Sequence, residues 1–297
     1  MGSVCGRFVA TTDPALLAEK IHAIDEATQV GGRPVAAGSI AAGSIAAGSI
    51  AAGSIKAPGS SHSGSSHSGS QAMAPNYNVA PTQTVSTVVK RHSEPGDEAT
   101  RRVRRMRWGL IPPWVKATAD GSPDTKGPLL INARSERVIS SPAFRSSVKS
   151  KRCLVPMDGW YEWAKPGEAK GAKTPFYLYA GDGEPLFMAG LWSVWRPRQD
   201  TGAASVESPL LSCTIITTDA VGSLAQIHDR MPLTVSEGDW DRWLDPDAPV
   251  DEGLLRGHGD LDRVQIREVS RLVNSVRNNG PELIAPVGPQ PEQATLL

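Results

Sequence analysis

The chain has 297 residues, enough for one large domain or two small ones, and 39% of them are hydrophobic, which excludes a protein that is disordered throughout. No run approaches the roughly 18 to 20 apolar residues of a membrane-spanning helix, and the first residues lack the apolar core of a signal peptide. We therefore expect a cytoplasmic protein without membrane contact. Cys5, Cys153 and Cys213 lie far apart, so we expect neither disulfides nor a metal or other cofactor.

The formal net charge is zero, but the charge is unevenly distributed. Residues 101–152 carry 13 Lys/Arg against 3 Asp/Glu, whereas residues 235–297 carry 12 acids against 6 bases. The first region could face phosphates. Charge solvated on ordinary surfaces is the alternative.

The first predicted element is an amphipathic helix over residues 13–26, with Asp13 as its cap and Pro14 in its first turn. Its apolar residues follow helical spacing at Leu16, Leu17, Ile21 and Ile24. Four copies of "AAGSI" follow at 36–55, and then "KAPG" and two copies of "SSHSG". Because Gly and Ser are costly to order, we expect 31–72 to be a flexible insertion.

Short β-type runs separated by turn residues then follow. They are "TVSTVVKR" (84–91), "RVRRMRWGLI" (102–111), "KRCLVPMDGWYEW" (151–163), "TPFYLYA" (174–180), "PLFMAGLW" (185–192) and "LLSCTIITTDA" (210–220). Helical stretches are predicted at 141–150 and 236–244. This mixture, without regular β-α alternation, predicts an α+β fold on antiparallel sheet.

Three residues could carry acid, base or nucleophilic chemistry. Glu162 lies among aromatic residues at the end of an apolar strand, where desolvation would raise its pKa and let it donate a proton. His228 can act as an acid or base near neutral pH. A carboxylate on a wet strand edge and an ordinary surface histidine are the alternatives. Cys5 lies at a chain end, away from any hydrophobic strand interior, whereas Cys153 and Cys213 read as core residues.

Other polar and aromatic residues suit a nucleic-acid ligand. Asn132 and Arg134 share one face if "LLINAR" is a strand, and an amide beside a guanidinium suits phosphate, although a structural turn network is equally possible. Trp108 and Trp114 flank a Pro-Pro pair in what reads as an exposed loop. They could stack on bases or pack in the core.

The motifs "CGRF", "YNVAPTQ", "RWGLIPPW", "INARSE", "DGWYEW" and "IHDRMP", in that order, closely resemble the SOS response-associated peptidase (SRAP) family, and "VSRLVNSVRNNGPELIAPV" resembles its closing segment. The resemblance implies a single, barrel-like domain of mainly antiparallel sheet with peripheral helices, over 1–30 and 73–290, with a disordered tail at 291–297. It also implies an abasic-site sensor of the DNA-damage response that bonds covalently to single-stranded DNA, a monomer that joins the nucleoid when bound to damaged DNA.

The same resemblance implies residue roles. Cys5, as an N-terminal residue, would form a thiazolidine with the abasic aldehyde, Glu162 would be the acid, and His228 would act on the imine. Asn132 would orient Cys5 or the sugar. The predicted DNA contacts are Arg7, Asn78, Pro81, Trp108 and Arg134. An AP-lyase side reaction and self-processing peptidase activity are expected as well.

"MGSV" stands before Cys5, where the family has only the initiator methionine. Three explanations compete: translation starts at position 4 from a GTG codon, a leader is removed by self-cleavage, or the amine is blocked and activity is lost. We favour the first. A thiol peptidase acting in trans and a non-covalent single-stranded DNA binder are the alternative functions.

Overall fold

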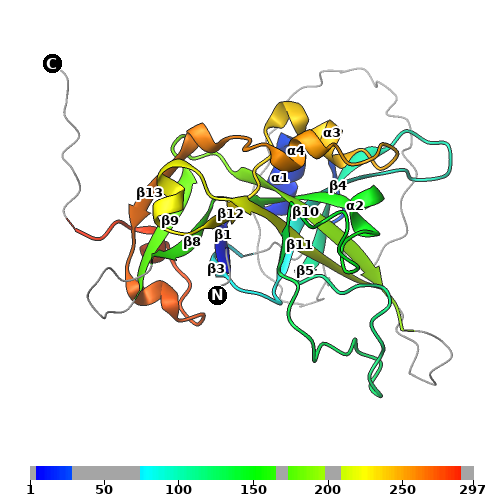
Figure 1. The fold of residues 1–297 in the computed structure, drawn as a ribbon, viewed down its shortest axis with the longest axis horizontal. Coiled ribbons are helices and arrows are strands. Elements are labelled where there is room, and N and C mark those ends of the chain that lie inside the picture. Colours follow the sequence, from blue (N-terminus) through cyan, green and yellow to red (C-terminus); the bar gives the residue numbers. More distant parts are fainter. Residues whose placement is uncertain (1–4, 29–73, 165–172, 198–208, 289–297) are drawn as a thin grey trace, which may run out of the picture.

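The computed structural model describes residues 5–28, 74–164, 173–197 and 209–288 (Figure 1). The predicted flexible insertion at 31–72 and the predicted tail at 291–297 lie outside the described residues, as do residues 1–4. The described part is built on two sheets with short peripheral helices, which confirms the predicted α+β class.

The smaller sheet has the strand order β13-β9-β8-β1-β3, and all its pairings are antiparallel. Its strands are β1 (Arg7–Ala10), β3 (Asn76–Val79), β8 (Gly159–Ala164), β9 (Thr174–Ala180) and β13 (Val264–Glu268). β1 lies between β3 and β8, so the residue that precedes it, Gly6, continues toward the end of β8. This sheet therefore positions the N-terminal motif against "DGWYEW".

The larger sheet has the order β12-β11-β10-β7-β4-β5-β2, and β6 pairs with β11 outside this path. Its strands are β2 (Ile24–Asp25), β4 (Thr84–Arg91), β5 (Thr100–Trp108), β6 (Asn132–Arg134), β7 (Arg152–Met157), β10 (Leu186–Trp195), β11 (Leu210–Asp219) and β12 (Arg230–Pro232). A parallel pairing of β11 with β5 closes the sheet into a ring. The larger sheet is therefore ring-like.

A shared core joins the two sheets. One hydrophobic cluster contains Phe8 and Trp160 from the smaller sheet together with Val85 and Cys213 from the larger one. Cys153 is buried in the same cluster, which confirms that both later cysteines are core residues. Phe8 also meets the ring of Trp108 edge-on at 5.0 Å.

The run 151–163 divides into two strands of different sheets. β7 ends at Met157 and β8 begins at Gly159, and Asp158 makes the crossing. The Asp158 carboxylate accepts hydrogen bonds from the backbone N–H and hydroxyl of Thr11, at 2.8 and 2.6 Å. The crossing is therefore fixed to the chain that follows β1.

The first helix is shorter than predicted. Asp13 caps it as expected, but α1 (Pro14–Lys20) ends six residues before position 26, because His22 adopts a φ of 51° and Ile24 enters β2. The other helical segments are α2 (Ser147–Ser150), α3 (Trp240–Leu244), α4 (Glu252–Arg256), η2 (Gly222–Gln226), η3 (Glu237–Asp239), η4 (Leu261–Arg263), η5 (Arg271–Asn274) and η6 (Pro281–Ile284). None of the helices among the described residues is long and apolar enough to cross a membrane.

Candidate active site

Cys5 lies directly before β1, against the end of β8. Its backbone N–H donates a 2.7 Å hydrogen bond to Oε1 of Glu162. Its φ of 44° is in the left-handed region, which residues with a side chain rarely adopt. The expectation that Cys5 avoids the hydrophobic interior is wrong: it is fully buried and belongs to the core cluster that joins the sheets.

Glu162 is the acidic partner of Cys5. It belongs to β8, whose pairing with β1 aligns Tyr161 with Arg7 and so brings the next residue toward Cys5. Desolvation raises the pKa of its carboxyl to about 8; the charge of Asp229 also raises it, while the hydrogen bond from Cys5 lowers it. At neutral pH Glu162 is therefore mostly protonated and can donate a proton to a group beside the Cys5 nitrogen.

The Cys5 thiol is held in its protonated form. Burial, and secondly the charge of Glu162, raise its pKa well above the ordinary value. A thiolate is the reactive form of cysteine. The nitrogen of Cys5, when it is a free amine, is thus the first nucleophile that this arrangement offers.

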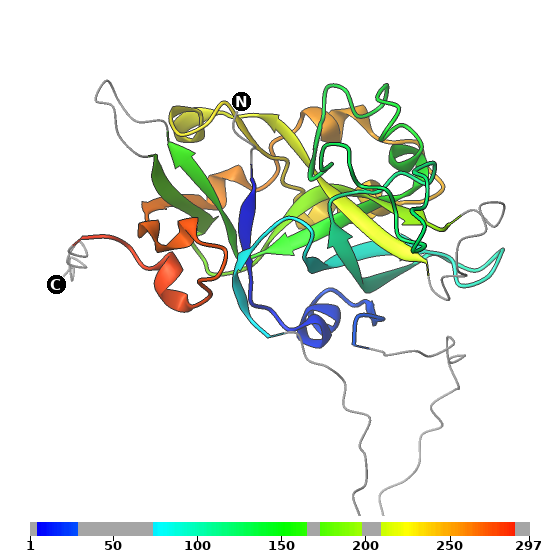
Figure 2. The same cartoon turned by 90° about the horizontal axis from the view of Figure 1, so that it is seen from below.

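His228 follows η2, in the turn that leads into β12. Its Nδ1 accepts a 3.0 Å hydrogen bond from the backbone N–H of Arg230 and lies 2.8 Å from Oδ1 of Asp229. The charge of Asp229 acts on Glu162, so this turn lies within electrostatic range of the Cys5–Glu162 pair. Figure 2 shows the same arrangement, with the start of β1 beside the yellow η2–β12 segment. No sequence pattern indicates that Asp229 acts on Glu162.

Asn132 and Arg134 lie on β6, as the strand prediction requires. Ala133 between them is buried, so the two side chains share the opposite face. The preceding residue, Ile131, lines a surface hollow together with Gly6, which places "INARSE" next to "CGRF".

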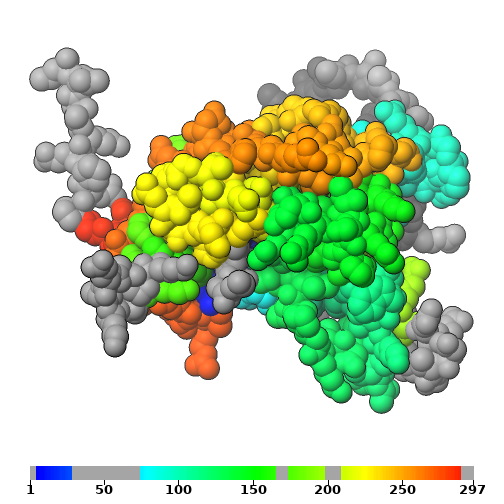
Figure 3. All heavy atoms as spheres, in the orientation of Figure 1, coloured from blue at the N-terminus to red at the C-terminus, as the bar shows by residue number. Residues whose placement is uncertain are grey.

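This hollow, here called the Cys5 hollow, has a volume of about 590 Å³. Its lining includes Gly6, Pro81, Thr82, Ile131 and Val276. On the face of the molecule that Figure 3 shows, a small blue patch of the N-terminal region lies below the yellow segment. The hollow therefore provides the space beside the buried Cys5 in which a ligand could lie.

Comparison with known proteins agrees with this arrangement of motifs. The family model described as SOS response associated peptidase (SRAP) matches residues 4–276. The chain belongs to the SRAP family.

Similar SRAP proteins come from bacteria and animals. The chain is 37% identical over 214 residues to the abasic site processing protein YoqW of Bacillus subtilis (strain 168), covering 71% of this chain and 85% of that protein. It is 31% identical over 239 residues to the abasic site processing protein HMCES of Gallus gallus, covering 72% of this chain and 66% of that protein. A crystal structure from Bacteroides thetaiotaomicron, with 19% identity, covers 95% of this chain and 99% of its own at a TM-score of 0.64, which supports the shared fold.

The SRAP motif "RWGLIPPW" contains two tryptophans in opposite environments. Trp108 is 0% exposed, and its indole N–H donates a 3.0 Å hydrogen bond to the carbonyl of Ile131, whereas Trp114 is 64% exposed. Trp108 therefore packs in the core in this structure, and its predicted contact with DNA stays a prediction. Period-two alternation with the buried Met106 could have shown that Trp108 points inward.

Asn78 of "YNVAPTQ" is also turned inward. Its side-chain amide donates hydrogen bonds to the carbonyls of Val273, Ser275 and Asn278, at 3.3, 2.9 and 3.0 Å. It is 2% exposed in this structure, and its predicted contact with DNA stays a prediction. Its role in the structure is to hold the closing segment of the family against β3.

Arg7 shares these partners. Its guanidinium donates to Oδ1 of Asn78 at 2.9 Å and to the carbonyl of Val273 at 2.8 Å, and it lies 6.0 Å from the ring centre of Trp163. These groups are neutral, so they leave the positive charge of Arg7 unbalanced at the edge of the Cys5 hollow.

Among the residues that the structure describes, no cluster of three or more His, Cys, Asp or Glu side chains forms a metal site.

Proposed function

We propose that this chain, in a form that begins at Cys5, processes abasic sites by bonding covalently to them in single-stranded DNA. The observation that carries the proposal is the hydrogen bond of 2.7 Å between the Cys5 nitrogen and Glu162, a carboxyl group whose pKa is about 8. The names of its relatives YoqW and HMCES, abasic site processing proteins, support the same substrate. We expect the protein to act as a monomer in the cytoplasm, at the nucleoid.

The first step joins the Cys5 amine to the aldehyde of the ring-opened abasic sugar. A free α-amine has a pKa near 8 and is partly neutral at physiological pH, so it can attack carbon C1′. Glu162 donates a proton to the hydroxyl that forms, water leaves, and the nitrogen returns a proton to the carboxylate. The product is an imine between Cys5 and the sugar.

The second step uses the thiol. The Cys5 sulfur adds to the imine carbon, its proton passes to the nitrogen, and a carbon–sulfur bond closes the thiazolidine ring. Because burial keeps the thiol protonated, it reacts only after the imine has brought an electrophile beside it. We assign acid and base steps on the imine and on ring reversal to His228, and orientation of Cys5 or the sugar to Asn132.

The remaining predicted residues act around this centre. Arg134 is exposed and Pro81 lines the Cys5 hollow, so both are available to the strand, while Arg7 supplies charge from the edge of the hollow. Where ring closure is slow, the imine acidifies the neighbouring C2′ position, and β-elimination breaks the strand. Removal of the residues before Cys5 would be hydrolysis of the Val4–Cys5 bond, with Glu162 against the nitrogen that leaves.

A thiol peptidase acting in trans is less well supported. It requires a Cys5 thiolate, and burial raises the pKa of this thiol. It would also keep its activity with a blocked amine.

The test compares a chain beginning at Cys5 with the chain that retains "MGSV". Each is incubated with single-stranded DNA containing an abasic site and run on a denaturing gel. We expect a shifted band from the Cys5-first chain and none from Cys5→Ala. Cys213→Ala is the matched control, because it removes a cysteine that is buried in the core, and it should retain the band. Absence of a band from the Cys5-first chain would refute covalent attachment and leave the non-covalent binder.

A further variant separates the two steps. Cys5→Ser keeps the amine but replaces the thiol, so its adduct should survive the gel mainly after borohydride reduction of the imine. A stable unreduced Cys5→Ser adduct, equal to that of the wild type, would contradict thiazolidine formation. Glu162→Ala should slow crosslinking whether position 5 holds the native Cys or the Ser of the Cys5→Ser variant.

A further inference from the structure

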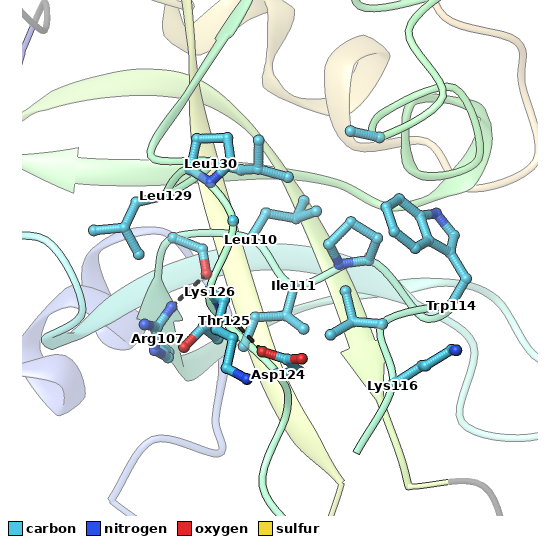
Figure 4. A pocket seen from close by; sticks show the side chains of 16 residues that line it. Arg107, Leu110, Ile111, Trp114, Lys116, Asp124, Thr125, Lys126, Leu129 and Leu130 are labelled. Atoms are coloured by element: carbon cyan, nitrogen blue, oxygen red, sulfur yellow. Dashed lines mark hydrogen bonds between the residues drawn. The ribbon is translucent and has the colours of Figure 1, made fainter. Parts of the chain in front are cut away.

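A second, apolar pocket lies beyond the Cys5 hollow. It has a volume of about 500 Å³ and is lined by residues from the segments 107–116 and 124–130, with Ala143 (Figure 4). Figure 4 shows Arg107 and Leu129 at one end and Trp114 at the other. Trp114 is 64% exposed and Leu129 is 49% exposed, so large apolar side chains here meet solvent. Exposed apolar surface gathered around a concavity is typical of a binding site.

The pocket is held in shape by backbone hydrogen bonds. The N–H of Leu110 donates to the carbonyl of Leu130 at 3.0 Å, and the N–H of Asp124 donates to the carbonyl of Lys116 at 2.8 Å. Ala117 and Pro123 form a bridge between the same two stretches of chain. The cavity is thus largely formed before any ligand arrives.

The charge around the pocket fits an anionic ligand. Arg107, Lys116 and Lys126 belong to its lining, and Asp124 is the acidic residue there. The guanidinium of Arg107 donates a 2.8 Å hydrogen bond to the carbonyl of Gly109. Because this carbonyl is neutral, the positive charge of Arg107 stays available to an anionic ligand. A ligand with a planar, weakly polar part and negative charges beside it matches this lining, and a nucleotide has that composition.

The pocket adjoins the Cys5 hollow. Leu130 lines the pocket and the next residue, Ile131, lines the hollow. The backbone of Trp108 bonds to both Thr82 and Gln83, at 2.8 Å each, and these two residues line the hollow as well. The hollow and the pocket are therefore lined by neighbouring segments of backbone.

We propose that the pocket binds one unstacked base of the single strand, at a fixed number of nucleotides from the abasic site. Trp114 stacks on that base, and the Arg107, Lys116 and Lys126 side chains lie against the flanking phosphates. This proposal rests on the proposed function, since it takes its strand from the abasic-site substrate. It adds that the protein senses an intact base at one place as well as a missing base at another.

The test measures non-covalent affinity. The probe is a short fluorescent single-stranded oligonucleotide with a central tetrahydrofuran, an abasic analogue that has no aldehyde and cannot bond to Cys5. A series of probes lacks one further base each, at successive positions on either side. We expect one position at which loss of the base weakens the Kd about 5- to 150-fold, the range for a lost base–aromatic stack.

Trp114→Ala should weaken the Kd for the parent probe by a similar factor and abolish the effect of that one position, and Trp114→Phe should restore most of it. Leu16→Ala, which truncates a side chain that is 63% exposed on α1, is the control and should change nothing. The proposal is overturned if Trp114→Ala leaves every Kd within about twofold, or if it weakens binding with no dependence on base position.

The two proposals can fail separately. The covalent yield of the wild type with a reactive abasic site tests the chemistry of Cys5 and Glu162, whereas the Kd series with the tetrahydrofuran probes tests the pocket. Position-specific loss of affinity without any covalent product would refute the chemistry and leave the base pocket. A covalent product with no position effect would refute the base pocket alone.

Discussion

Replacing Glu162 by Gln should remove the pH dependence that this residue imposes on stability. Glu162 is 3% exposed, and desolvation raises its pKa from the ordinary 4.5 to about 8. The unfolded chain thus loses this proton near pH 4.5, whereas the folded chain keeps it until about pH 8. Stability from this group is complete below pH 4.5 and falls as the pH rises through that window.

The magnitude follows from the width of the window. Each pH unit between the two values costs about 1.4 kcal/mol of unfolding free energy, so the total is about 5 kcal/mol by pH 8 to 9. Gln is nearly isosteric with the protonated carboxyl, and its side-chain carbonyl can still accept from the Cys5 N–H. Glu162→Gln should therefore match the wild type near pH 4.5 and exceed it increasingly toward pH 8.

Urea titrations of both proteins at intervals from pH 4.5 to 8.5 measure this difference. In the difference between the two unfolding free energies, the pH dependence from every other titrating group cancels, because both proteins contain those groups. Parallel curves, with a constant difference between wild type and Glu162→Gln, would refute a raised pKa at this position and with it the role of Glu162 as a proton donor at neutral pH.

Four further variants test the assignment of buried, exposed and charged residues. Trp108→Ala should lower the unfolding free energy by about 3 to 5 kcal/mol in urea, as truncation of a core aromatic does, whereas Trp114→Ala should change it by less than about 1 kcal/mol. Asn78→Ala should cost about 1 to 3 kcal/mol in the same titration, because it removes the hydrogen bonds to the carbonyls of Val273, Ser275 and Asn278 and one acceptor of the Arg7 guanidinium. Asp229→Asn should lower the pKa of Glu162, so the decline of the crosslinking rate at high pH should begin at lower pH; an unmoved profile would contradict the proximity of the two carboxyls.

Strands with strong local signals were predictable from the sequence. Residues 84–91 and 174–180 form β4 and β9 with the predicted bounds, since turn residues flank each run of β-branched or aromatic residues. The end of α1 was not predictable, because the period of Leu17 and Ile21 continues to Ile24, while the pairing of Ile24 with Arg102 takes that residue into the larger sheet. Tertiary pairing overrides helical spacing there.

The charge pattern was also only partly informative. Of the basic stretch 101–152, Arg101 pairs with Asp241, Arg102 and Arg104 pair with Glu26, and Arg152 donates to buried carbonyls. A count along the chain cannot show this, because the partners come from distant segments. The basic residues that line the apolar pocket, together with the exposed Arg134, stay available to a phosphate backbone.

Contacts between segments that are distant in the chain also explain why the motifs of one family need not all touch its ligand. Arg7 and Asn78 are bonded to each other and to the carbonyl of Val273, and Trp163 donates its indole N–H to Asn274 at 2.7 Å. Three motifs and the closing segment thus form one network around β1, a strand of four residues. So short a strand cannot fix the position of Cys5 by its own pairing. The network supplies that constraint, and it holds the Cys5 nitrogen at the distance from Glu162 on which the proposed chemistry depends.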